Sequence, residues 1–246
     1  QPAKLTDAAK NIAYKIQEET QKYVGDLIER AVDSTGQNNI VISGGYGLNC
    51  VANYYFKDRF PELNIFVDPI SHDGGTAIGM AKLLHWELIA NEHEGDIRVH
   101  NEFIKDPLKT LYLGPDYDNN ITQKIIDTGL NDSIKKTDVT TEDVADIIIG
   151  GNIVAIWQGR SEAGPRALGN RSLVFDPTRV AGKDEVNQIK GREWFRPFAG
   201  TVMAEHAEDW FDLRGLKETP FMMYAVNVHE GKEDKIPAIT HVDDTC

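Results

Sequence analysis

The feature that most constrains the fold is an order of strand, glycine-rich turn and helix that occurs twice near the start of the chain. Residues 39–43 (NIVIS) form a short apolar strand that leads into GGYGLN at 44–49, and a helix is expected over 52–58. Residues 64–69 (NIFVDP) lead through SHDGG into an apolar helix over 76–90. Alternating strands and helices are typical of α/β layers. The sequence therefore predicts an α/β fold.

A long helix is expected before this pattern and a polar linker after it. Apolar side chains recur at helical spacing over residues 12–31, with Thr6 as the N-cap and Gly36 as the stop. The linker falls at about 91–106, where the sequence becomes polar. We therefore expect two domains, residues 1–100 and 101–246. In the second domain, the expected helices are 119–130, 141–151 and one near 203–212, and the expected strands lie near Ile134 and at 152–158, 172–175 and 221–228.

The chain is acidic, yet its arginines are concentrated in one window. The formal net charge is −13 over 246 residues, which argues against nucleic acid or an anionic membrane as a partner of the whole surface. Six of the ten arginines nevertheless lie between Arg160 and Arg196. Positive charge gathered in this way suits a small anionic ligand better than a polyanion.

Several other classes of protein are disfavoured by the sequence. The two cysteines, Cys50 and Cys246, are too few for a disulfide framework or a zinc module. The most apolar stretch, residues 144–157, is too short and too polar for a membrane span. The first residues do not resemble a signal peptide, so we expect a cytoplasmic protein.

The arginine window has the composition of a shaped anion site. Residues 159–172 read GRSEAGPRALGNRS, in which glycine and proline let the backbone turn sharply and approach a ligand. Arginine offers a planar fork of donors that matches phosphate and carboxylate. The alternative is surface ion pairing with Glu162, Asp176 and Glu193, which contributes about 0–1 kcal/mol per pair. The glycine and proline spacing favours anion binding.

Two glycine-rich turns at strand-to-helix junctions are further candidates. The GGYGLN turn can present backbone N–H groups to phosphate or ribose oxygens, although the same pattern occurs in plain turns. In SHDGG, Asp73 can either ligate a metal ion or cap the following helix. The residues alone leave both alternatives open.

These segments together resemble O-carbamoyltransferases of the nodulation and antibiotic-tailoring type. The resemblance rests first on GRSEAGPRALGNRSLVFDPTR and IKGREWFRPFAGTVMAE. SGGYGLNCVAN is similar to the SGGxxLNCxxN segment of that family, SHDGGTAIGMA to its metal-and-nucleotide aspartate segment, and LGPDY to the start of its second domain. Gly200 stands where the family usually has proline. The motifs follow the family order over nearly the whole chain.

The resemblance implies a specific architecture and reaction. It implies the C-terminal half of an actin-like (ASKHA-type) ATPase domain followed by an α+β YrdC-like domain. The YrdC-like domain of the family forms carbamoyladenylate from carbamoyl phosphate and ATP and releases pyrophosphate and phosphate. The ATPase-like domain, which holds an iron ion, passes the carbamoyl group to a substrate hydroxyl. Small molecules are thus the expected partners, with Mg²⁺ accompanying ATP and a homodimer as a candidate assembly.

The resemblance also assigns roles to residues by position. The residues expected to bind carbamoyl phosphate or the ATP phosphates and to act in catalysis are Arg166, Arg171, Lys190 and Arg196. Those expected to contact the nucleotide are Gly44, Gly45, Asn49, Gly75, Arg160 and Arg192. Asp73 is the expected metal ligand.

The histidine metal ligands of the family and its late NTSFN-like segment are missing from the sequence. We therefore expect a piece of a longer protein that does not complete the reaction alone. Two alternatives remain: a related carbamoyl- or threonylcarbamoyl-adenylate enzyme of tRNA modification or hydrogenase maturation, and a non-catalytic nucleotide-binding module. The domain order and GPRALGNRS favour the small-molecule transferases. The sequence does not define the carbamoyl acceptor.

Overall fold

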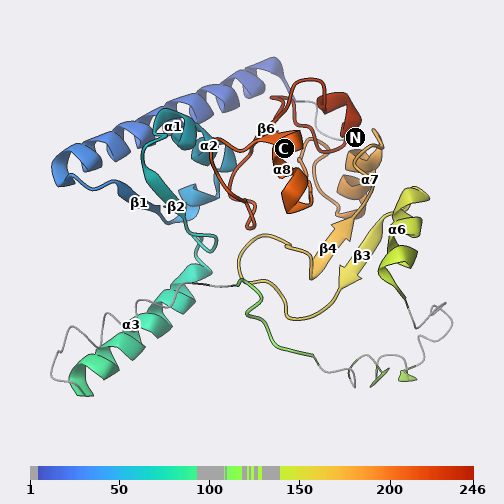
Figure 1. The fold of residues 1–246 in the computed structure, drawn as a ribbon, viewed down its shortest axis with the longest axis horizontal. Coiled ribbons are helices and arrows are strands. Elements are labelled where there is room, and N and C mark those ends of the chain that lie inside the picture. The colour runs from blue at the N-terminus through green and yellow to red at the C-terminus, as the bar shows by residue number, and fades with distance from the viewer. Residues whose placement is uncertain are drawn as a thin grey trace.

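The computed structural model describes residues 5–92, 108, 110–117, 121, 123–124, 127–128 and 139–246 (Figure 1). Helices and three small sheets alternate along these residues, which confirms the predicted α/β character. The expected domain boundary near residue 100, the helix over 119–130 and the strand near Ile134 lie wholly or largely outside them and stay predictions.

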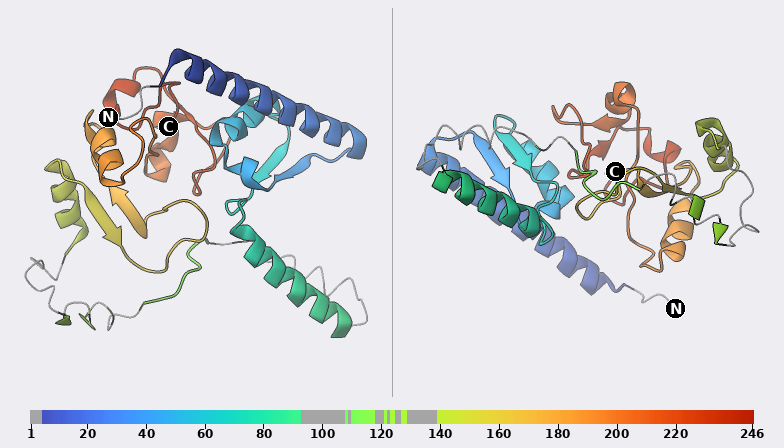
Figure 2. Two further views of the ribbon diagram at one scale, coloured as in Figure 1. Left: turned by 180° about the vertical axis from the view of Figure 1, so that it is seen from behind. Right: turned by 90° about the horizontal axis from the view of Figure 1, so that it is seen from below.

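The first half begins with the long helix α1 (Asp7–Thr35). The Thr6 side chain caps its N-terminus by accepting from the Ala9 N–H at 3.2 Å, and Gly36 ends it in the left-handed conformation at φ 66°. Both ends agree with the prediction from capping residues. The helix lies along α2 (Cys50–Arg59), as Figures 1 and 2 show.

A two-stranded parallel sheet connects the two glycine-rich turns. β1 (Asn39–Ile42) pairs with β2 (Asn64–Val67) residue for residue. The turn after β1 contains the short 3-10 helix η1 (Gly45–Leu48) and leads into α2. The turn after β2 leads into α3 (Gly75–Glu92), which extends away from α1 and α2 (Figures 1 and 2). Because the strands are parallel, both turns leave the sheet at the same edge.

The second half is built from short elements. α6 (Thr141–Ile149) precedes an antiparallel hairpin of β3 (Val154–Trp157) and β4 (Arg171–Val174), and α7 (Gly182–Ile189), which was not expected, follows it. The helix expected near 203–212 is divided into shorter elements. These and the remaining elements are η3 (Ala204–His206), α8 (Ala207–Trp210), β5 (Phe211–Asp212), β6 (Asn227–Val228) and η4 (Glu233–Lys235).

The strand expected over 221–228 is wrong for most of its length. Only Asn227–Val228 pairs as a strand, with β5. Met222 has a φ of 55°, and the carbonyls of Met222 and Met223 accept from the side chains of Cys50 and Asn53. Because these carbonyls are bound by α2, they do not pair with a neighbouring strand.

Helix α2 belongs to two clusters of buried apolar side chains. Ala52 and Phe56, each 0% exposed, lie in the first cluster together with Met223 from the second half. Tyr54, which is 4% exposed, lies in the second cluster. The other members of the first are Ile28, Ile42, Phe60, Leu63 and Val67, and those of the second are Phe211, Leu213, Val226, Val228, Ile236 and Ile239. The two halves of the chain therefore share α2 as a common core element.

Replacing Phe56 by alanine should lower the free energy of unfolding by about 3–5 kcal/mol, because a large buried side chain leaves a cavity. Phe66→Ala is the matched control, since Phe66 is 53% exposed and its loss should cost about 1 kcal/mol or less. Urea denaturation of the complete protein measures both. Equal effects of the two substitutions would contradict the central place of α2.

Candidate functional site

The β3–β4 hairpin carries the loop of residues 158–170, here named the arginine loop. Trp157 of β3 lies opposite Arg171 of β4, so the loop starts and ends at one point of the sheet. All three of its glycines have a positive φ, a conformation that favours glycine because it has no Cβ. They are Gly159 (50°), Gly164 (99°) and Gly169 (110°).

Glu162 holds the arginine loop together from inside. Its Oε1 accepts from the backbone N–H groups of Leu168 and Asn170 at 2.8 Å and of Arg171 at 3.3 Å. Burial by itself raises the pKa of Glu162, but the backbone donors outweigh it, and the pKa lies below its ordinary value. The carboxylate is therefore bound by the loop backbone, whereas the surface-pair alternative assigned it to an arginine.

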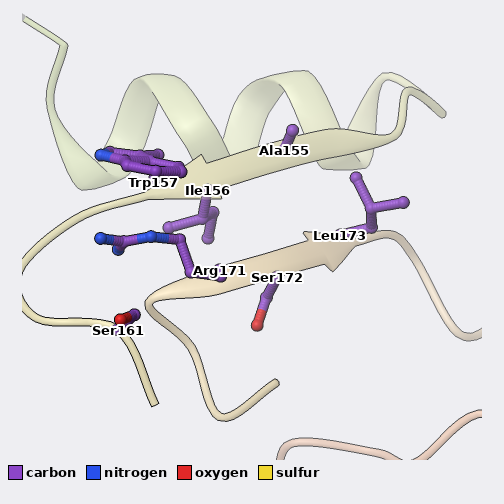
Figure 3. Close-up of a pocket in the computed structure, with 7 residues that line it drawn as sticks. All are labelled: Ala155, Ile156, Trp157, Ser161, Arg171, Ser172 and Leu173. Carbon is purple, nitrogen blue, oxygen red and sulfur yellow. The ribbon is translucent and has the colours of Figure 1, made fainter. Parts of the chain in front are cut away.

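Arg171 closes the neck of the loop. Its Nη1 donates to the carbonyls of Gln158 and, at 2.8 Å, Asn170, and its Nη2 donates to the carbonyl of Gly159 at 3.1 Å. The guanidinium carbon lies 3.7 Å from the ring centre of Trp157. Figure 3 shows these two side chains at one end of an open hollow of about 500 Å³ on the hairpin. Much of the donor capacity of Arg171 is thus engaged within the loop.

Segment 110–117 binds the arginine loop along its side. Arg160 donates through Nε to the Gly114 carbonyl at 2.7 Å. The Tyr112 hydroxyl donates to the Leu168 carbonyl, also at 2.7 Å. The LGPDY motif therefore lies directly against the arginine motif, although 46 residues separate Arg160 from Gly114.

The tip of the arginine loop reaches both glycine-rich turns of the first half. Arg166 donates through Nη2 to the Leu48 carbonyl at 3.3 Å and contacts Cys50 Sγ at 3.1 Å. Gly164 packs closely against Pro69, which lies just before the SHDGG turn: a Cβ atom added at Gly164 would lie 3.2 Å from the Pro69 carbonyl oxygen. The structure thus brings together three motifs that the sequence presents separately.

Each of the two glycine-rich turns contains buried polar atoms. A Cβ atom at Gly47 would lie 2.8 Å from Ser71 Oγ, so the turns are in direct contact. Ser71 is 4% exposed, and its buried Oγ has no hydrogen-bond partner among the described residues, nor do the hydroxyl of Tyr46 and Nε2 of His72. Most buried polar groups in proteins are hydrogen-bonded, so these atoms provide binding capacity for water or a ligand.

The contacts of Arg166 at this junction do not include an acidic side chain among the described residues. Its Nη2 contacts uncharged acceptors, and its Nε is buried and makes no hydrogen bond to the residues that the structure describes. Among the described residues no carboxylate lies within ion-pair distance of Arg166, whereas Arg179 pairs with Glu185 at 3.0 Å and Arg196 with Glu193 at 2.6 Å. Surface pairing thus explains Arg196 and Arg179 but not Arg166.

The second basic cluster lies at the end of α7. Lys190 is exposed there, and Arg192 donates through Nε to Asn187 Oδ1 at 2.6 Å. Burial, and then the charge of Arg196, lower the pKa of Arg192. Across the described ranges, no hydrogen bond or ion pair joins Lys190, Arg192 or Arg196 to the arginine loop. Their shared role with Arg166 stays a prediction.

The GGYGLN turn exposes its first glycines and uses its asparagine as a helix cap. Asn49 accepts from the Ala52 N–H at 3.1 Å through Oδ1 and donates from Nδ2 to Gln17 Oε1 at 2.9 Å. Gly44 and Gly45 are exposed, and apart from their own chain neighbours no described residue has an atom within 4 Å of a Cβ placed on either. A ligand can therefore approach this backbone closely.

Asp73 and Gly75 lie at the start of α3. Asp73 is exposed, and a Cβ at Gly75 would collide with the Ile70 carbonyl, so this turn requires glycine. His72 Nδ1 accepts from the Gly74 N–H at 2.9 Å, which leaves the proton of the neutral ring on Nε2. In the part of the chain that the structure describes, no group of three or more His, Cys, Asp or Glu side chains is arranged to hold a metal ion.

Two residues of the SGGYGLNCVAN motif organise the junction, although the sequence analysis assigned neither of them a role. Asn53, 0% exposed, donates from Nδ2 to the carbonyls of Gly47 and Met223, both at 2.8 Å. Cys50 contacts both Arg166 and the Met222 carbonyl. The motif marks both residues in the sequence, but it does not reveal that their partners are Arg166, Met222 and Met223.

Comparison with known proteins identifies the family. Two family models match, Carbamoyltransferase N-terminus over residues 2–82 and Carbamoyltransferase C-terminus over residues 145–246. The chain belongs to the carbamoyltransferase family. This confirms the family predicted from the motifs.

Three relatives of this carbamoyltransferase chain are nodulation proteins. It is 34% identical to Nodulation protein NolNO of Sinorhizobium fredii, over 98% of this chain and 35% of that protein. It is 33% identical to Nodulation protein NolO of Bradyrhizobium diazoefficiens, over 98% and 43%, and 32% identical to Nodulation protein U of Sinorhizobium fredii, over 85% and 33%. The chain thus spans about a third to two fifths of the length of these relatives. In the described ranges, no helix combines the length and hydrophobicity that a membrane crossing requires.

Removing the Glu162 carboxylate should loosen the arginine loop. Glu162→Ala leaves three backbone donors without an acceptor, which should cost about 2–3 kcal/mol of local stability, and Glu162→Gln should cost less because an amide oxygen remains. Since the pKa of Glu162 is lowered, its contribution is complete above the ordinary glutamate pKa and is lost as the pH falls through the lowered one. Hydrogen exchange of residues 163–171 measures this loosening.

Glu193→Ala is the control, because its partner Arg196 is an exposed side chain outside the loop. It should leave exchange in residues 163–171 unchanged. Wild-type protection in Glu162→Ala would show that the carboxylate does not hold the loop.

Proposed function

We propose that the complete protein is an ATP-dependent O-carbamoyltransferase that transfers the carbamoyl group of carbamoyl phosphate to the hydroxyl of a small-molecule acceptor. The observation that carries the proposal is Arg166, a guanidinium without a carboxylate partner among the described residues, at the junction of the arginine loop and two glycine-rich turns. Family membership supports the same reaction.

The proposed architecture has an actin-like part and a YrdC-like part. We assign residues 1–100 to the C-terminal half of an actin-like ATPase domain and residues 101–246 to a YrdC-like domain. The parallel β1–β2 pair, with a glycine-rich turn leading from each strand into a helix, supports the first assignment. The shared core around α2 would hold the two domains in contact.

The proposed reaction has three balanced steps. Water displaces phosphate from carbamoyl phosphate and leaves carbamate. A carbamate oxygen bonds to the α-phosphorus of ATP while pyrophosphate leaves, which gives carbamoyladenylate. The acceptor hydroxyl oxygen then bonds to the carbamoyl carbon, its proton passes to a base, and AMP leaves. Each step develops negative charge on phosphate or carboxylate oxygens, which fixed guanidinium donors stabilise.

Arg166 is the group best placed to provide this stabilisation. Its Nη1 makes no hydrogen bond to the described residues, so two N–H groups are available to an anion, and its buried Nε is also without a partner among those residues. Arg171 retains Nε but is otherwise engaged at the loop neck. The roles of Lys190, Arg196, Arg160 and Arg192 at the phosphates remain part of the proposal.

Nucleotide binding would involve the exposed backbone of the glycine turns. Gly44 and Gly45 allow close approach, Asn49 has one amide hydrogen left after its bond to Gln17, and Gly75 opens the second turn. Mg²⁺ would arrive with ATP. The described residues around Asp73 do not by themselves fit an iron ion, so an ion there would need further ligands.

The proposed setting is the cytoplasm, with small molecules as partners and without nucleic acid. The net charge of −13 supports the absence of nucleic acid. A homodimer remains a prediction.

Arg166→Ala should lower kcat/KM for pyrophosphate release from ATP and carbamoyl phosphate by a factor on the order of 100, the cost of removing one preorganised oxyanion donor. A coupled pyrophosphate assay on the complete protein measures it. Arg179→Ala is the control: it removes the same charge from the same window, but Arg179 is paired with Glu185, so activity should stay within about threefold of wild type. Pyrophosphate release that does not depend on carbamoyl phosphate would refute the proposal.

A further inference from the structure

Cys50 lies between the arginine loop and the C-terminal part of the chain. As the first residue of α2 it is held in place by the Asn49 cap. Its Sγ contacts Arg166 Nη2 at 3.1 Å and donates toward the Met222 carbonyl at 3.1 Å. A thiol has one hydrogen to donate and lone pairs to accept with, so both contacts can exist together.

The contact on the Met222 side is part of a wider attachment. The Ala225 N–H donates to the Cys50 carbonyl at 3.2 Å, and Asn53 Nδ2 donates to the Met223 carbonyl at 2.8 Å. The segment from Met222 to Ala225 is thus fixed to the first turn of α2 by backbone and side-chain bonds. The Cys50 thiol is therefore held in a fixed position, from which it can orient the Arg166 guanidinium.

The chemistry of the group that accepts the Arg166 hydrogen bond matters as much as the position of that group. A carboxylate at this point would orient Arg166 but would also neutralise it and compete with an anionic ligand. Burial raises the pKa of the Cys50 thiol more strongly than the Arg166 charge lowers it, so the thiol stays neutral near pH 7. A neutral thiol orients the guanidinium and leaves its charge uncompensated.

We propose that Cys50 is a positioning residue, which aims the Arg166 guanidinium at the phosphate of carbamoyl phosphate without cancelling its charge. The inference rests on the proposed function, because it needs Arg166 to bind that anion. It assigns Cys50 no bond to the substrate.

Three substitutions at Cys50 separate orientation from charge. Cys50→Ala removes the sulfur atom that accepts the Arg166 hydrogen bond. It should raise the KM for carbamoyl phosphate on the order of 3- to 10-fold, which is the effect of one weak hydrogen bond to a charged group. Cys50→Ser retains a hydroxyl and should stay within about twofold of wild type. Cys50→Asp supplies a carboxylate and should raise the KM further than alanine does, because it pairs with Arg166.

Cys246→Ala is the matched control, since Cys246 is also a half-buried free thiol, with its Sγ accepting from the Gly200 N–H at 3.2 Å. It should leave the KM for carbamoyl phosphate unchanged. Thermal melting identifies any variant that does not fold. If Cys50→Ala does not fold, the difference between Cys50→Ser and Cys50→Asp decides in its place.

A double substitution tests whether Cys50 acts through Arg166. In an Arg166→Ala background, Cys50→Ala should cause no further loss. Losses that multiply in the double variant would show that Cys50 acts elsewhere and would overturn the inference. So would a wild-type KM in folded Cys50→Ala while Arg166→Ala is impaired, a result that leaves the proposed function standing. If Arg166→Ala itself behaves like wild type, the proposed function and this inference both fail.

Discussion

The burial of α2 is the constraint on which the rest of the structure depends. Ala52, Asn53 and Phe56 are fully buried on one side of this short helix, and Tyr54 enters a separate apolar cluster on the other. A helix enclosed in this way has no freedom to rotate or slide, because close-packed interiors do not deform continuously. Its N-terminal turn is therefore a fixed reference, and the glycine turn, the arginine loop and the segment after Phe221 are all positioned against it.

Charge at the junction is organised by giving carboxylates other partners. Glu162 lies in the same loop as Arg166, yet its Oε1 binds three backbone N–H groups. Arg166 in turn is held by a carbonyl and a thiol. Arg166 thereby has no carboxylate partner among the described residues, although Glu162 lies in the same loop, and the Glu162 carboxylate stabilises the shape of the loop instead.

Local features were predictable from the sequence, and long-range ones were not. Thr6 and Gly36 marked the ends of α1 because caps act over a few residues, and the glycines of the arginine loop indicated its turns. The contact of Arg166 with Cys50 joins residues 116 apart, and periodicity carries no information about such pairs. The apolar run at 221–228 indicated a strand, but carbonyls bound by α2 and the left-handed conformation of Met222 prevailed. For the candidate site, the motifs were visible in advance, and their meeting was not.

The arginine loop is closed at its neck by Arg171, in its interior by Glu162 and at its tip by Arg166. Because three sites of contact fix this short segment, its backbone has almost no freedom to change its path. One added residue lengthens an extended chain by about 3.3–3.6 Å, which is more than a hydrogen bond tolerates. An insertion between Glu162 and Arg166 would displace the guanidinium from Leu48 and Cys50 even if every side chain were retained. When related chains are aligned, gaps in this loop should therefore mark divergence of the site more reliably than exchanged residues do.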